Sequence, residues 1–135
     1  MKRLNEICRE FGLLSIYLFG SRVDDGLDIL RGDSVSSGGS DLDVGVFSAT
    51  RRSDTRRLGE LQIALEEIFN PLRVDLVPLD RVDPLFQVRA VDGHRVAASD
   101  STAADERELE VLRRAADLLP FQRQAELDVF GVSTS

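Results

Sequence analysis

Residues 13–21 read LLSIYLFGS, and residues 41–47 read DLDVGVF. The first stretch is a short apolar run that stops at Gly20-Ser21, a pattern typical of a buried strand followed by a turn. The second predicts another strand, on which Asp41 and Asp43 project from one face and Leu42 from the other. A short helix from Ser21 is expected to lead towards the second strand.

The rest of the chain alternates between helical and strand patterns. Helical spacing predicts a helix over residues 3–11, another that opens at Ser53 and ends before Asn70-Pro71, and a short one over 84–91. Residues 73–77 predict a third strand and 94–97 a minor one. This order indicates an α/β fold with a small mixed sheet flanked by helices. We expect one domain over residues 1–130 and a disordered tail over 131–135.

The last helix is expected to begin at Thr102, where Thr102 and Asp105 form a capping-box pattern. Pro120 should kink or break it, because a proline removes a helical hydrogen bond. One face of this helix is predicted to enter the core. That face comprises Leu109, Leu112, Ala116 and Leu119.

Composition excludes several classes of protein. The 135 residues carry a net charge of -7, so the chain lacks the basic footprint needed to bind a nucleic acid backbone directly. No apolar run approaches the roughly 20 residues of a membrane helix. The single Cys8 forms no intramolecular disulfide and gives no sign of secretion. We therefore expect a cytoplasmic protein with no membrane contact.

Three aspartates on apolar strands suggest a metal site. Asp41 and Asp43 share a strand face, and Asp75 lies within the third strand. At ~4 Å and an effective dielectric near 20, two like charges repel by about 4 kcal/mol, which a divalent cation relieves. Oxygen-only ligands suit Mg²⁺. The alternative is that the aspartates lie at solvated strand ends or cap loops.

Gly20-Ser21 lies at the junction between a predicted strand and a predicted helix. Glycine allows a ligand to approach the backbone closely, and a helix N-terminus favours an anion, so this turn can hold a phosphate. The alternative is a plain turn in which Ser21 caps the helix.

These motifs, taken together, resemble a known superfamily. LFGSR at 18–22, SDLD at 40–43 and VDLV at 74–77 resemble the polymerase-beta-type nucleotidyltransferases, and especially the minimal nucleotidyltransferase (MNT) antitoxins. The similarity runs from about Leu13 to the last helix. It implies that the turn Gly20-Ser21-Arg22 holds the triphosphate and that Asp41 and Asp43 ligate two Mg²⁺ ions. Asp75 would be a third ligand or the base that takes the acceptor proton.

The resemblance also implies a reaction and a partner. An MNT antitoxin transfers AMP from ATP to a tyrosine of its cognate HEPN toxin, a ribonuclease, and silences it in a possible hetero-oligomer. Little surface remains for an acceptor pocket, which favours a protein acceptor, and the helix from Thr102 is the expected contact. Two alternatives stay open: a stoichiometric antitoxin with a vestigial site, and a nucleotidyltransferase acting on a small molecule such as an antibiotic.

The chain departs from the family in one spacing. Nineteen residues, positions 22 to 40, separate Ser21 from Asp41, whereas the family usually places about ten there. The Gly- and Ser-rich residues 33–39 are expected to form an outward, mobile loop that can be shortened without loss of activity. If the segment instead covered the pocket, the chain would be a nucleotide-free binding module.

Overall fold

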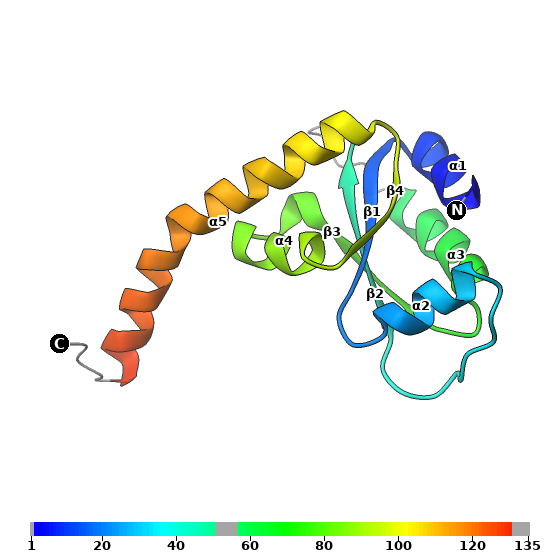
Figure 1. The fold of residues 1–135 in the computed structure, drawn as a ribbon, viewed down its shortest axis with the longest axis horizontal. Helices are drawn as coiled ribbons and strands as arrows, with labels where there is room; N and C mark the ends of the chain where they lie inside the picture. The colour runs from blue at the N-terminus through cyan, green and yellow to red at the C-terminus, as the bar shows by residue number, and fades with distance from the viewer. Residues whose placement is uncertain (1, 51–56, 131–135) are drawn as a thin grey trace.

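The computed structural model describes residues 2–50 and 57–130. The predicted alternation of helices and strands is confirmed (Figure 1). The predicted helix start at Ser53 and the tail over 131–135 lie outside the described residues. The elements are α1 (Lys2–Phe11), β1 (Leu13–Phe19), α2 (Val23–Leu30), β2 (Leu42–Ser48), α3 (Leu58–Phe69), β3 (Val74–Pro78), the 3₁₀ turn η2 (Leu79–Arg81), α4 (Pro84–Val91), β4 (His94–Ala98) and α5 (Ser101–Phe130).

The strands form one four-stranded mixed sheet in the order β3-β2-β1-β4. β1 pairs antiparallel with both β2 and β4, and β2 pairs parallel with β3. All seven residues of β1 are buried, which accounts for a sequence that is apolar except at Ser15. The minor strand predicted over 94–97 is β4, which pairs along β1.

Helices cover both faces of the sheet (Figure 1). On one face, α1, α2 and α3 enclose a core that includes Leu18, Leu42 and Leu65. On the other face, α4 and the first part of α5 cover Tyr17 and Phe47. Because side chains alternate along a strand, Leu42, Val44 and Val46 point to the α1–α3 face and Asp43 to the α4–α5 face.

α5 departs from its prediction in two respects. It begins at Ser101, with the Asp100 side chain accepting from the Ala103 amide at 3.1 Å, so the Thr102–Asp105 capping box is not used. The predicted core face is wrong: the buried positions are Ala104, Val111 and Ala115. Small residues permit close packing of α5 against α4. The predicted face is exposed instead, and consists of Leu109 (53%), Leu112 (47%), Ala116 and Leu119 (56%).

α5 is also not broken at Pro120, because the helix continues to Phe130 and curves away from the body of the domain (Figure 1). A helix passes a proline by bending away from the ring, which separates the ring from the preceding turn. Its first half is fastened to the sheet by polar contacts: Tyr17 donates to Glu108 at 2.9 Å, and Glu108 also pairs with Arg95. Burial raises the pKa of Tyr17 to about 12, so its hydroxyl stays a donor at neutral pH.

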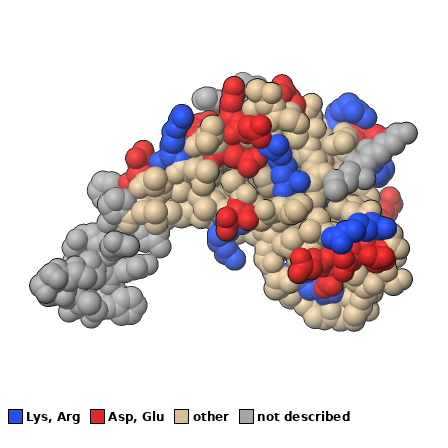
Figure 2. All heavy atoms as spheres, viewed as in Figure 1, with Lys and Arg blue, Asp and Glu red and all other residues tan. Residues whose placement is uncertain are grey.

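Charged side chains of both signs gather along the first half of α5 and beside α2 in the view of Figure 2. Among the described residues, no helix is both long and apolar enough to cross a membrane.

Candidate active site

Two of the predicted aspartates meet at the edge between β2 and β3. Asp43 and Asp75 are register partners in the parallel pair. Both precede residues that turn to the α1–α3 core, so their side chains share the α4–α5 face of the sheet. Asp43 is half-buried and Asp75 is exposed. The parallel register therefore brings together two carboxylates that lie 32 positions apart in sequence.

The environment of Asp43 works against its negative charge. Burial raises the pKa of Asp43, and the neighbouring Asp75 carboxylate raises this pKa further, by like charge and by hydrogen bonding. Arg89 acts in the opposite direction and lowers the pKa. A half-buried carboxylate beside a second carboxylate is a place where an added cation is stabilised.

The turn after β1 is built around the Asp43 carboxylate. Gly20 has φ +81°, and a Cβ placed on it would lie 2.1 Å from Asp43 Oδ2. The carboxylate thus packs directly on the Gly20 backbone, which explains why a glycine is required there. Sequence reasoning linked these two residues through a resemblance, and the structure places them in contact.

Asp41 and Ser21 both lie just outside the strand and the helix in which they were predicted. Asp41 precedes β2 and is exposed, because the strand begins at Leu42. Ser21 precedes α2, which begins at Val23, and its hydroxyl lies 2.9 Å from that of Ser40. Within residues 2–50 and 57–130, no group of three His, Cys, Asp or Glu side chains has the arrangement of a metal site. Asp43 and Asp75 are side by side, and Asp41 also acts on Asp43, because its charge contributes to raising the Asp43 pKa.

A magnesium ion still fits the donors that are present. Mg²⁺ in nucleotide sites takes only one or two carboxylates and completes its shell with water and phosphate oxygens. Asp43 and Asp75 supply two carboxylates, and the mutual repulsion that raises the pKa of Asp43 is what such a cation would relieve.

Arg22 lies where a phosphate ligand was predicted, but its guanidinium is occupied. It donates to the backbone carbonyls of Ser36, Gly38 and Ser40 and pairs with Asp25. The expectation of a free, dispensable 33–39 loop therefore needs correction, because a buried arginine holds that loop. The first part of the segment between Ser21 and Asp41 forms α2, and the loop swings outward before it returns to β2 (Figure 1).

Sequence reasoning missed Arg89 as a member of the site. The residue is exposed on α4, and its guanidinium carbon lies 5.1 Å from the centre of the Phe86 ring. Phe86 in turn meets Phe19 edge-on at 6.1 Å, immediately before Gly20. Two aromatic rings in edge-to-face contact thus place the Arg89 cation near the sheet edge where Asp43 lies. The only sequence signal was an Arg three residues after Phe86 on a short helix, which is too common to be informative.

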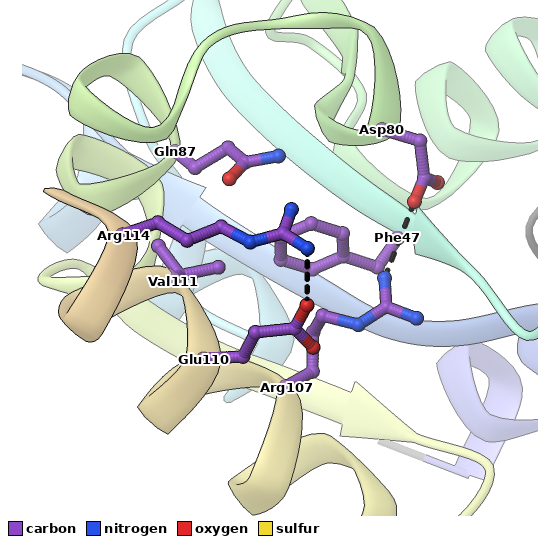
Figure 3. A pocket seen from close by; sticks show the side chains of 7 residues that line it. All are labelled: Phe47, Asp80, Gln87, Arg107, Glu110, Val111 and Arg114. Atoms are coloured by element: carbon purple, nitrogen blue, oxygen red, sulfur yellow. Dashed lines mark hydrogen bonds and ion pairs between the residues drawn. The ribbon is translucent and has the colours of Figure 1, made fainter.

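A pocket of about 200 Å³ lies near the other end of β2 (Figure 3). Arg107 pairs there with Asp80 at 3.2 Å, and Arg114 with Glu110 at 2.6 Å. None of the predicted site residues lines this pocket, which marks where α5 fastens to the sheet. Its lining consists of Phe47, Asp80, Gln87, Arg107, Glu110, Val111 and Arg114.

No protein-family model matches this chain, and no curated protein sequence matches it significantly. Solved structures do resemble it. One is a toxin–antitoxin with AMP-PNP, 22% identical, covering 97% of this chain and 98% of the matched chain at a TM-score of 0.66. Another is the Shewanella oneidensis tri-AMPylated HEPN toxin in complex with MNT antitoxin, 22% identical, covering 98% and 100% at 0.61. A third is the MntA–HepT toxin–antitoxin, 20% identical, covering 97% and 96% at 0.63. The chain therefore shares the fold of these solved structures.

Proposed function

We propose that this chain is a Mg²⁺-dependent nucleotidyltransferase that moves AMP from ATP to a hydroxyl of a cognate HEPN toxin and thereby silences the toxin. The observation that carries the proposal is the Asp43–Asp75 pair packed on the Gly20 turn. The shared fold supports it, since one similar structure contains AMP-PNP and another contains a tri-AMPylated toxin. We expect the antitoxin to act in the cytoplasm, within a hetero-oligomer.

The described residues divide the chemistry among them. Asp43 and Asp41 would hold Mg²⁺, with Asp75 as third ligand or base. When bound, the ion supplies charge neutralisation for the triphosphate and lowers the pKa of the attacking hydroxyl. The Gly20-Ser21 turn would hold phosphate oxygens, because a glycine backbone admits a close approach. Arg89 adds a cation for the phosphates on the α4 side.

The transfer itself is an in-line displacement at the α-phosphorus. A bond forms between the acceptor oxygen, of a tyrosine by family resemblance, and this phosphorus, and the bond to the bridging oxygen of the leaving pyrophosphate breaks. The acceptor proton needs a base at the surface, since the acceptor arrives on another chain. Asp75 is more exposed than Asp43, which suits it to that role.

The direct test is the intact mass of the cognate toxin after incubation with this chain, ATP and Mg²⁺. We expect a gain of one or more AMP units, no gain with EDTA, and none with Asp43→Asn. An unchanged toxin mass, with neutralisation that persists in Asp43→Asn, would favour the stoichiometric binding module. Label on a small hydroxylated compound instead would favour the antibiotic-type enzyme.

The exposed apolar face of α5 is our proposed contact with the toxin. Leu109, Leu112, Ala116 and Leu119 stand at i, i+3, i+7 and i+10, so they share one face of the helix. Three exposed leucines in one row exceed what a free surface normally carries as scattered apolar residues. α5 also extends beyond the sheet, which makes this face accessible (Figure 1).

Leu112→Glu is therefore expected to weaken toxin binding by about 10- to 100-fold, since a buried charge in an apolar contact costs a few kcal/mol. ATP binding should stay unchanged, as should the melting temperature. The matched control is Ile63→Glu, which places the same charge at an exposed apolar position of α3 (62% exposed). Calorimetry with the purified toxin measures both. Equal toxin affinity for the two variants would show that α5 is not the contact.

A further inference from the structure

The long segment between Ser21 and Asp41 has a defined course. Its first part is α2, and residues 31–41 then return along the domain to β2. At the head of the segment stands Arg22, whose side chain is only 10% exposed although arginine is usually a surface residue. A buried arginine needs partners for its donors, and these partners identify what it does.

The Arg22 guanidinium uses each of its three nitrogens. Nη1 donates to the carbonyls of Gly38 at 2.5 Å and Ser40 at 3.1 Å, and Nη2 donates to that of Ser36 at 2.8 Å. Nε pairs with the Asp25 carboxylate at 2.8 Å, which fixes the orientation of the planar group. One side chain thus holds three carbonyls of a loop that lies 14 to 18 residues further along the chain.

Gly39 and Ser40 leave room for the Arg22 guanidinium and fix the loop beside it. Gly39 has φ +98°, and a Cβ placed on it would lie 3.3 Å from Arg22 Nη1. Ser40 meets Ser21 through the two hydroxyls at 2.9 Å. On the far side of Asp41, the Leu42 amide donates to the Arg73 carbonyl at 2.8 Å, where the pairing of β2 with β3 begins. Asp41 is therefore held between the Arg22 clamp and the first bond of the sheet.

We infer that Arg22 is a positioning residue: its guanidinium clamps residues 36–40 and thereby sets Asp41 beside Asp43 for metal binding. This inference rests on the proposed function for the role of Asp41. Arg22, which was predicted to contact phosphate, is thereby assigned instead to holding the loop between α2 and β2 in place. Lysine cannot replace it, because a single ammonium group lacks the planar fork that reaches three carbonyls and a carboxylate together.

The first test is hydrogen exchange of the metal-free chain, which needs no enzymatic activity. In Arg22→Lys, peptides covering residues 34–41 should exchange at least about tenfold faster than in the wild type, because the clamp that limits local opening is lost. Arg31→Lys is the matched control, since Arg31 lies on the same segment but is exposed, and its guanidinium pairs with the neighbouring Asp28. Exchange that is unchanged in Arg22→Lys would overturn the clamp.

The second test is Mn²⁺ affinity, measured by calorimetry with an ATP analogue whose α and β phosphorus atoms are joined by a methylene group. Arg22→Lys should weaken Mn²⁺ binding about tenfold, as should Asp41→Asn, and the double variant should be no weaker than either because both act on one ligand. Additive losses, or an unchanged Mn²⁺ affinity, would overturn the positioning role. Weaker binding of the analogue without any metal would instead assign Arg22 to the phosphates. A wild type that binds Mn²⁺ but transfers no AMP would overturn the proposed function alone.

Discussion

Asp43→Asn is expected to reduce AMP transfer by about 10³-fold or more, because it removes one of the two carboxylates that meet at the edge of β2 and β3. The same change should not lower stability. Burial and Asp75 raise the pKa of Asp43, so its ionised form is disfavoured in the folded chain. An amide of the same shape avoids that charge. Transfer rates and thermal melts of metal-free protein measure the two effects.

The pH dependence of this stabilisation has a definite sign. A carboxyl with a raised folded pKa opposes folding once it is ionised, so the wild type loses stability as pH rises above the ordinary aspartate pKa of about 3.9. The advantage of Asp43→Asn should therefore be largest at neutral pH and vanish in acid, where both side chains are uncharged. Asp92→Asn, an exposed position, is the control. A melting temperature of Asp43→Asn below that of the wild type at pH 7 would contradict the electrostatic account.

Gly20→Ala is expected to destabilise the chain by about 2–4 kcal/mol and to abolish transfer. Two costs combine: φ +81° is strained for any residue with a Cβ, and that Cβ would lie 2.1 Å from Asp43 Oδ2. Gly12→Ala measures the backbone strain without the clash, because Gly12 has φ +63° and a Cβ placed on it would have nothing within 4 Å. We expect only about 1–2 kcal/mol there, the strain alone. Chemical denaturation measures both variants.

A double variant isolates the contact further. Asp43→Ala removes Oδ2 and leaves the Asp43 Cβ 3.6 Å from the new methyl group, an ordinary distance. Gly20→Ala should therefore cost less in the Asp43→Ala background than in the wild type, by roughly 1–3 kcal/mol. If Gly20→Ala lowered the free energy of unfolding equally in the two backgrounds, the new methyl group would not be clashing with the Asp43 carboxylate. That result would contradict the proposed packing of Asp43 on Gly20.

Sequence patterns predicted the elements of the central sheet well because their signals are local. β1 is apolar except at Ser15, since the strand is central and buried on both faces, and Gly20 ends it where the backbone turns. An aspartate among apolar residues on each of two strands led us to expect that Asp41, Asp43 and Asp75 converge, and the parallel register of β2 and β3 then placed Asp43 beside Asp75. Strand ends were less reliable: Asp41 was placed on β2, yet the first pairing bond belongs to Leu42.

The last helix was predicted with the wrong face inwards, and the reason is physical. A helical pattern gives the period of the apolar residues but not which face meets the core when two faces are apolar. α5 carries large side chains at Leu109, Leu112 and Leu119 and small ones at Ala104 and Ala115. The small ones pack inside, because α5 approaches α4 closely, and the leucines remain exposed.

The sequence by itself therefore determined the order of the helices and strands, the Gly20 turn and the strand face on which each aspartate lies, because periodicity, turn chemistry and strand alternation act between near neighbours. The pairing of Asp43 with Asp75 depended on the parallel register of β2 and β3. Tertiary structure alone decided what Arg22, Arg89 and α5 do. Arg22 reaches carbonyls up to 18 residues away, and Arg89 on α4 acts on the Asp43 carboxylate of β2. An arginine can satisfy its donors in many places, so only the folded arrangement of the chain selects the partners it meets.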